Sequence, residues 1–247
     1  MSRVVAIWSP SGAGATTLTL NIAAALAARG LGVTALDLNL TAPALALYAD
    51  LLPHEQPSEA CLSRLLPALH GGRLTQDELT RHLRCGAGFH LLPGMLDLLS
   101  VSRLTEGDVR QLVRMLATRS DLVLVDVDAP LDSIGCLPVL ELADLVRVVV
   151  GPEITSRFLT RRAVLPLLGA GWGPNLALIY NRSGGVSASH LSADIGLPVA
   201  AEIPGLGLMD GLVESGEIAY SVRSVRPALA RFRSAIDALA AQVAKGV

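Results

Sequence analysis

Short apolar runs alternate with amphipathic stretches along most of the chain. The apolar runs are continuous, a pattern typical of strands that are buried on both faces of a parallel sheet. Strands are therefore expected at residues 4–8, 33–38, 88–92, 122–126, 145–150, 176–180 and 198–203. The stretches between them place apolar residues at helical spacing and predict helices at residues 16–29, 105–119, 134–142, 154–168, 190–195 and 227–244.

About seven alternations of strand and helix, with no hairpin signal between them, predict an α/β fold: a doubly wound, mostly parallel sheet flanked by helices. Residues 40–85 are helix-prone but interrupted by four prolines, so we expect short helices over one edge of the sheet. No linker rich in Pro, Gly or Ser and no sharp change of composition divides the chain. Residues 1–247 are therefore expected to form a single domain.

Capping residues and one apolar stripe refine the predicted helices. Thr105 can cap the helix that follows it, because Glu106 and Asp108 are favourably placed in the first turn. Ser187 or Ser189 can cap the short helix near residue 190. The last helix carries its apolar residues on one side, at Leu229, Phe232, Ile236, Leu239 and Val243. Its polar side lacks lysines, so the stripe predicts core packing rather than membrane contact.

The composition is that of a globular chain, with 51% hydrophobic residues, 17% charged residues and a formal net charge of −2. This charge gives no general electrostatic reason to bind nucleic acid, and no uninterrupted apolar stretch is long enough to span a membrane. Lys245 is the only lysine. A positively charged side chain at any site earlier in the chain must therefore be an arginine or come from a partner chain.

The three cysteines, Cys61, Cys85 and Cys136, are too few and too scattered for a disulfide framework, which is typical of proteins of the reducing cytoplasm. Cys61 and Cys85 together with His82 and His90 are a conceivable zinc set. Their spacing matches none of the usual zinc sites, and there is no CxxC pair, so zinc is not favoured.

A run of small residues, Ser9-Pro10-Ser11-Gly12-Ala13-Gly14-Ala15-Thr16-Thr17, separates the first strand from the first helix. A glycine-rich turn at this place directs backbone N–H groups and the positive end of the helix dipole to one point, which favours a phosphate. The P-loop pattern is G-x-x-x-x-G-K-[ST]; Ser9 stands at its first glycine and Ala15 at its lysine. Thr16 lies where that pattern supplies the hydroxyl that binds Mg²⁺.

Two carboxylates follow other predicted strands. Asp37 and Asn39 end the strand at residues 33–38, and Asp126 directly follows the apolar run Leu122-Val123-Leu124-Val125. The carboxyl ends of parallel strands form the edge at which open α/β folds bind ligands. Asp128 competes with Asp126 for the carboxylate role, and we prefer Asp126 because of its place next to the run. The loop and these carboxylates together outline a nucleotide site.

This layout resembles the MinD/ParA family of deviant P-loop ATPases, whose loop reads K-G-G-x-G-K-T-[TS] and whose second strand ends in D-x-D. The resemblance extends over nearly the whole chain, as far as Asn181-Arg182 after a late strand. Within the family, Gly12–Thr17 and Asp37–Leu40 look most like the CpaE/TadZ branch, which localises pilus assembly machinery. MinD-like septum-site proteins are the neighbouring possibility.

The resemblance implies a site for ATP or ADP with Mg²⁺. The backbone from Ser11 to Thr17 would hold the phosphates, through Ser11, Gly12, Ala13, Gly14, Ala15, Thr16 and Thr17. Asn181 would face the adenine, with Arg182 beside it. Thr16, Asp37 and Asp126 would hold the Mg²⁺ ion directly or through water.

The same resemblance implies that catalytic charge is missing at three positions. The family's two lysines fall at Pro10 and Ala15, and its water-orienting aspartate falls at Asn39. An amide cannot accept a proton as a carboxylate can, and the loss of one cation in phosphoryl transfer can cost on the order of 10³–10⁵-fold in rate. No catalytic residue is therefore assigned, and we expect nucleotide binding with little or no hydrolysis.

These expectations describe a cytoplasmic, nucleotide-binding spatial regulator that positions pilus, secretion or septum components. A homodimer and protein partners are implied by the family, and recruitment to the inner face of the membrane or a cell pole would be indirect. Two alternatives stay open. One is a slow but genuine ATPase in septum-site or chromosome partitioning, and the other is a nucleotide-free structural scaffold.

Overall fold

Eight strands form one sheet in the computed structural model, which describes residues 2–52, 61–127 and 129–245. The sheet has the order β3-β4-β2-β5-β1-β6-β7-β8, and the strands are parallel except for β3. In chain order they are β1 (Arg3–Trp8), β2 (Val33–Leu38), β3 (Arg84–Gly86), β4 (Phe89–Leu92), β5 (Leu122–Val127), β6 (Leu145–Val150), β7 (Leu176–Ser183) and β8 (Val199–Pro204). The predicted doubly wound α/β fold is confirmed.

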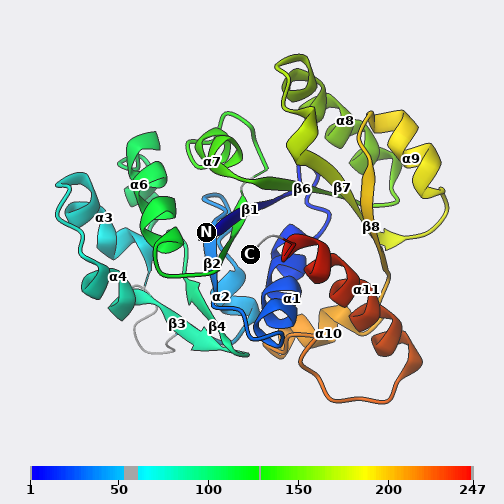
Figure 1. Ribbon diagram of the computed structural model, residues 1–247, viewed down its shortest axis with the longest axis horizontal. Helices are drawn as coiled ribbons and strands as arrows, with labels where there is room; N and C mark the ends of the chain where they lie inside the picture. Colours follow the sequence, from blue (N-terminus) through cyan, green and yellow to red (C-terminus); the bar gives the residue numbers. More distant parts are fainter. Residues whose placement is uncertain (1, 53–60, 128, 246–247) are drawn as a thin grey trace.

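Helices cover both faces of the sheet (Figure 1). On one face lie α1 (Ala15–Ala27), α2 (Leu45–Tyr48), α10 (Met209–Glu214) and α11 (Pro227–Val243). On the other lie α3 (Leu62–His70), α4 (Gln76–His82), α6 (Glu106–Ala117), α7 (Cys136–Leu142), α8 (Ile154–Gly169) and α9 (Ala188–Ile195). The short helix α5 (Leu98–Val101) precedes α6, and a turn of 3₁₀ helix, Gly173–Asn175, precedes β7.

Alternate side chains of the central strand enter two separate apolar cores. In β1, Val4, Ala6 and Trp8 face the core under α6 and α7, whereas Val5 and Ile7 face the core under α1 and α11. All five are buried. This two-sided burial is the physical reason that the strand is a continuous apolar run rather than an alternating one.

One expectation was wrong at the edge of the sheet. No hairpin was expected, but β3 pairs with β4 in antiparallel orientation, with Arg84 opposite Leu91 and Gly86 opposite Phe89. The two turn residues, Ala87 and Gly88, have φ angles of 50° and 84°. A two-residue turn of this kind needs positive φ values, which glycine adopts without strain but alanine does not. The alanine hid the turn from a reading of the sequence.

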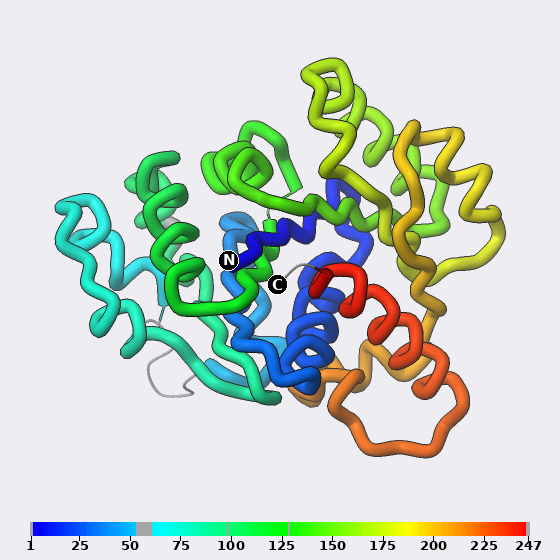
Figure 2. Tube along the Cα trace, viewed as in Figure 1, coloured from blue at the N-terminus to red at the C-terminus, as the bar shows by residue number. Residues whose placement is uncertain are grey.

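The helix predictions hold, with small shifts of their ends. Thr105 caps α6, and Ser187 rather than Ser189 caps α9. The apolar stripe of α11 is buried against the sheet, as expected for core packing. Near its end, the Val243 carbonyl accepts a hydrogen bond of 2.8 Å from Arg3, so the start of β1 and the end of α11 lie side by side (Figure 2). Helix α10 was not expected.

Two further findings concern the described part of the chain. No helix there is long and apolar enough to cross a membrane. No group of three or more His, Cys, Asp or Glu side chains among the described residues is arranged to hold a metal ion. Of the three cysteines, Cys85 is exposed, whereas Cys61 and Cys136 are buried.

Candidate functional site

The candidate site lies at the carboxyl edge of the central strands. β1 runs between β5 and β6, and its residue Ile7 is level with Asp126 in β5. Asp126 is in turn level with Asp37 in β2. The loop that leaves β1 therefore emerges between these two carboxylates and the β6 side of the sheet, which is where parallel α/β sheets bind ligands.

The loop between β1 and α1 has the backbone of a phosphate cradle. Gly12 and Gly14 have φ angles of 69° and 97°, in the left-handed region that favours glycine. The Ser9 hydroxyl holds the loop from inside: it accepts a hydrogen bond from the Ala13 N–H at 2.7 Å and donates to the Val149 carbonyl of β6 at 3.0 Å. Both bonds are buried, so the loop is fixed to the sheet by its own side chain.

The first turn of α1 opens toward this loop. Gly14 is the N-cap residue, and no side chain caps the helix there, so this end can offer its N–H groups and its positive dipole to an anion. In the same turn, the Thr16 hydroxyl donates a hydrogen bond of 2.6 Å to Oδ2 of Asp126. Thr16 and Asp126 are thus brought together, as the sequence predicted, and both are oxygen ligands of the type that Mg²⁺ prefers.

Asp37 and Asn39 shape the neighbouring loop. The Asp37 carboxylate is buried and accepts hydrogen bonds from the N–H groups of Asn39 at 3.1 Å and Leu45 at 3.0 Å. Gly94 allows this packing, because a Cβ there would lie 3.1 Å from the Asp37 Cγ. Oδ1 of Asn39 accepts from the Ala42 N–H at 3.0 Å. Both side chains therefore stabilise the turn after β2, and the Mg²⁺ role of Asp37 stays a prediction.

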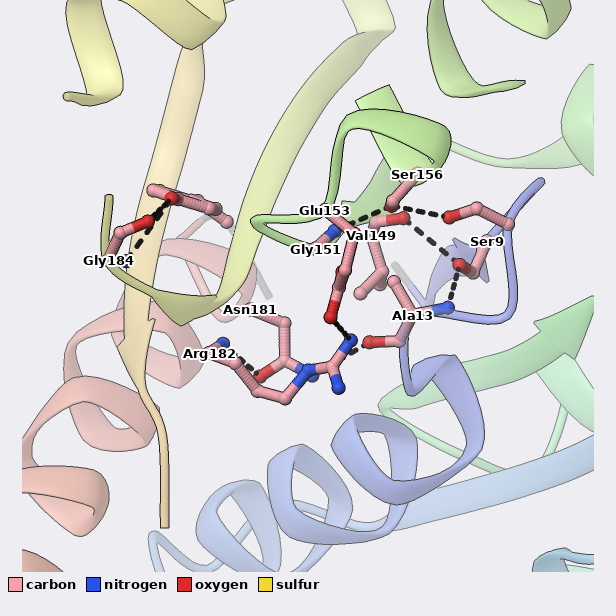
Figure 3. A network of polar contacts seen from close by, with 11 residues as sticks. Ser9, Ala13, Val149, Gly151, Glu153, Ser156, Asn181, Arg182 and Gly184 are labelled. Atoms are coloured by element: carbon pink, nitrogen blue, oxygen red, sulfur yellow. Dashed lines mark hydrogen bonds and ion pairs between the residues drawn. The ribbon is translucent and has the colours of Figure 1, made fainter. Parts of the chain in front are cut away.

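Asn181 joins the end of β7 to the glycine loop. Its Nδ2 donates a hydrogen bond of 2.8 Å to the Ala13 carbonyl (Figure 3). A Cβ on Gly14 would lie only 2.8 Å from the same Nδ2 atom. Glycine is thus required at position 14 for two reasons: its left-handed backbone and the close approach of Asn181.

Two further contacts join this corner to the start of α8 (Figure 3). Nη2 of Arg182 lies 2.8 Å from Oε1 of Glu153, the N-cap residue of α8. The Ser156 hydroxyl lies 2.7 Å from the Ser11 hydroxyl and accepts a hydrogen bond of 2.8 Å from the Gly151 N–H. The loop, β7 and α8 are therefore connected by side chains from three separate parts of the chain.

A cavity of about 420 Å³ lies between the glycine loop and the segment that follows β8. This volume is within the range of small-molecule sites. Its lining residues are Gly12, Ala13, Gly14, Thr17, Leu18, Asn181, Arg182, Pro204, Gly205, Leu206, Gly207, Met209, Asp210 and Phe232. Arg182 is the one cation among them. The predicted residues of the loop and of β7 thus line one cavity, and its opposite wall, at residues 204–210, was not predicted.

The structure brings together most of the residues singled out in the sequence and adds others. Pro10 and Ala15 lie in the loop and at the start of α1, while Asp128 lies outside the described residues. Sequence reasoning missed the tether at Ser9, the contacts of Glu153 and Ser156, and the wall at residues 204–210. For that wall a signal was present, since Pro204-Gly205-Leu206-Gly207 follows a strand at the same edge of the sheet.

Comparison with solved structures gives the fold. The chain is similar to a ParA family ATPase from Chlorobium tepidum TLS, with a TM-score of 0.83 and 22% identity over 98% of this chain and 99% of that chain. It is similar to the septum site-determining protein MinD complexed with Mg-ADP from Pyrococcus horikoshii OT3, with a TM-score of 0.79 and 23% identity over 99% and 97%. A chain of the MinC:MinD cell division protein complex from Aquifex aeolicus gives a TM-score of 0.75 and 23% identity over 98% and 96%. No family model and no curated protein matches the chain.

Proposed function

We propose that this chain, which has the fold of ParA and MinD ATPases, binds ATP or ADP with Mg²⁺ and hydrolyses the nucleotide slowly or not at all. Its role would be that of a switch that positions other proteins. The observation that carries the proposal is the arrangement of three features: the Gly12–Gly14 loop and the uncapped start of α1 line one cavity, and the Thr16–Asp126 pair is formed from the same first turn of α1. Together they offer hydrogen-bond donors for phosphate, hard oxygen ligands for Mg²⁺ and space for a nucleotide base.

The phosphates would be held by backbone rather than by side-chain charge. The N–H groups of Gly12 and Ala13 donate to Ser9, so the other N–H groups between Ser11 and Thr17 and the dipole of α1 would supply this binding without lysine. Ser9 stabilises this loop conformation, because its two buried hydrogen bonds fix the loop to β6. Arg182 is the cation of the cavity, and it is paired with Glu153.

The residues present fit a Mg²⁺ ion and an adenine ring. Thr16 and Asp126 would hold the ion, and Mg²⁺, when bound there, would neutralise phosphate charge. Asn181 would meet the adenine at the cavity wall beside Gly14. The segment at residues 204–210 would cover the other side of the base.

Hydrolysis is expected to be slow because the residues at three positions lack the charge or basicity that catalysis requires. Pro10 and Ala15 lack the charge that phosphoryl transfer requires, and each missing cation costs on the order of 10³–10⁵-fold in rate. Oδ1 of Asn39 is already bound to the Ala42 N–H and has no basic character. Binding loses less than catalysis, because the backbone cradle is intact.

The remaining parts of the proposal rest on the resemblance to the CpaE/TadZ branch. We propose a homodimer that recruits pilus, secretion or septum proteins from the cytoplasmic side of the membrane, as a single-domain chain with no nucleic-acid partner. The MinC:MinD complex among the structural neighbours supports a role in protein recruitment. The retained Thr16–Asp126 pair supports a slow ATPase as the second candidate.

A pair of glycine variants tests nucleotide binding by calorimetry with Mg-ADP. Gly14→Ala places a Cβ 2.8 Å from Asn181 Nδ2 at a φ of 97°, inside the cradle. Gly30→Ala is the matched control, because Gly30 also has a left-handed φ of 84° but has no atom within 4 Å of its Cβ position. We expect wild type and Gly30→Ala to bind Mg-ADP and Gly14→Ala to lose binding.

Two results would count against the proposal. If the Gly14→Ala variant binds Mg-ADP as tightly as Gly30→Ala, the cradle is not the binding site. If wild type shows no binding at millimolar Mg-ADP or Mg-ATP, the chain is a nucleotide-free scaffold.

A further inference from the structure

Helix α8 exposes most of its surface. Only Ser156, Thr160, Val164 and Leu167 of this helix are buried, and they form the narrow side that packs against the sheet and α9. On the outside, Ile154 is 74% exposed, Phe158 65% and Leu165 51%. Nine large apolar side chains are exposed among the described residues, and four of them, including Leu159, belong to α8. Apolar groups gathered on one surface element mark an interaction site more often than scattered ones do.

The exposed apolar residues form a row along the helix. Ile154, Phe158 and Leu165 are separated by four and seven positions, the spacing of neighbours on one helix face. The buried residues lie at other positions of the helical repeat, so the row points away from the core. A groove of about 580 Å³ lies beside the Phe158–Leu165 part of the row and is lined by Phe158, Arg161, Arg162, Leu165 and Pro166.

The charges on α8 all have one sign. Arg157, Arg161 and Arg162 are its only charged residues, and none is acidic. Arg161 lies 3.6 Å from Asp194 of α9, which holds its side chain beside the row. Arg162 has no ion pair within the described part of the chain and is exposed. Arg161 and Arg162 therefore lie beside the row of apolar groups.

We propose that α8 is the docking surface for an acidic amphipathic helix of a protein partner. Such a helix would place its apolar side chains between Ile154, Phe158 and Leu165 and direct its carboxylates to Arg161 and Arg162. Apolar anchors at helical spacing are the mode by which a helix binds in a groove, and the charges select the partner.

A membrane and a second copy of the chain fit this surface less well. Interfacial helices that bind membranes carry their cations opposite a broad apolar face, whereas here Arg161 and Arg162 line the same groove as Phe158 and Leu165. Pairing of α8 with α8 of a second copy would bring three arginines of each chain together without a carboxylate from either helix. Like charges at an interface are unfavourable.

The proposal is tested by selecting binders from a displayed library of random helical peptides with the full chain. Selected peptides are then synthesised and titrated against purified protein by fluorescence anisotropy. Two double variants remove the surface: Phe158→Ala with Leu165→Ala, and Arg161→Glu with Arg162→Glu. The controls are Val225→Ala, an apolar residue that is 99% exposed elsewhere, and Arg114→Glu, an exposed arginine on α6. Thermal melts check that every variant folds.

We expect the selected peptides to be rich in Asp and Glu, with apolar residues at helical spacing. Each α8 double variant should weaken their binding about tenfold or more, since truncating interface anchors has effects of this size, while the two controls bind like wild type. The proposal is overturned if no peptide is selected, if the peptides lack acidic character, or if the α8 variants bind equally well. It is also overturned if the α8 variants instead lose binding to vesicles of anionic phospholipid, or lose self-association in sedimentation.

Discussion

Ala15 is the residue at which a single side chain is expected to change the site most. It is the first residue of α1, directly after Gly14, and it stands where the P-loop pattern has lysine. The variant Ala15→Lys should tighten ATP binding about tenfold or more, because it adds a charge-assisted hydrogen bond to the phosphates. Calorimetry with Mg-ATP measures this effect.

The control for this charge is Ala28→Lys, at the exposed C-cap of the same helix. It adds the same charge far from the loop and should leave ATP affinity unchanged. Equal affinities of wild type and Ala15→Lys would show that the start of α1 does not face the phosphates.

Ser9 has a structural role that can be measured without nucleotide. Its buried hydroxyl pairs with the Ala13 N–H and the Val149 carbonyl. Ser9→Ala leaves both groups without this partner, so the free energy of unfolding should fall by about 1–3 kcal/mol in urea titrations. Ser215→Ala removes an exposed hydroxyl bonded to the Gly211 carbonyl at 2.8 Å and should change it by less than about 0.5 kcal/mol. Similar losses for both variants would contradict the role of Ser9.

At the scale of residues, the sequence predicted the partners that strand ends bring together and missed those that need distant contacts. Thr16 and Asp126 were predicted because Thr16 lies at the start of the helix that follows the first strand and Asp126 stands at the end of β5, so both lie at the carboxyl edge of a parallel sheet. Ser9 was seen only as a substituted glycine, because its acceptor, the Val149 carbonyl, is 140 positions away. The pairing of Arg182 with Glu153 was hidden for the same reason.

At the scale of elements, the hydrophobic period and the capping residues were sufficient to predict a strand or helix wherever the apolar pattern was long. The buried strands and α6, α8 and α11 were predicted close to their observed ends. The short helix α10 was missed because its six residues are too few to show a period, and the hairpin at Ala87-Gly88 was missed because alanine stands at one of its two turn positions with positive φ. In the range 40–85, of which residues 53–60 lie outside the described part of the chain, the expected short helices include α2, α3 and α4, and the strand β3 begins at Arg84.

The cap of α6 provides a test at this scale. Thr105 and Asp108 form a capping box, and Asp108 also lies 3.0 Å from Nδ1 of His70 on α3. Thr105→Ala should lower the free energy of unfolding by about 1 kcal/mol, because it removes the side-chain partner of the Asp108 N–H. Thr105→Ser keeps that partner and should be close to wild type in the same urea titration. A loss as large in Thr105→Ser would assign the effect to the methyl group instead.

At the scale of the whole molecule, the order of the strands creates the site. β1 lies between β5 and β6, so the glycine loop meets Asp126 on one side and Ser156 and Asn181 on the other. The sequence indicated the edge of the sheet that carries Asp126 and Asn181, since each stands near the end of a strand, but it did not indicate Ser156 in α8. It did not indicate the strand order, which depends on contacts between strands far apart in the chain. The wall at residues 204–210 is a consequence of that order.

The central proposal is that the chain binds a nucleotide and hydrolyses it slowly or not at all. It is tested by mixing excess protein and Mg²⁺ with γ-labelled ATP and following retained ATP and released phosphate in the same sample. We predict that the protein retains ATP, that EDTA releases it, and that phosphate appears little or no faster than in buffer. Sustained phosphate release that is lost in Asp126→Ala would contradict the proposal and identify an ATPase. Failure to retain ATP would also contradict it, because the chain would then be a nucleotide-free scaffold.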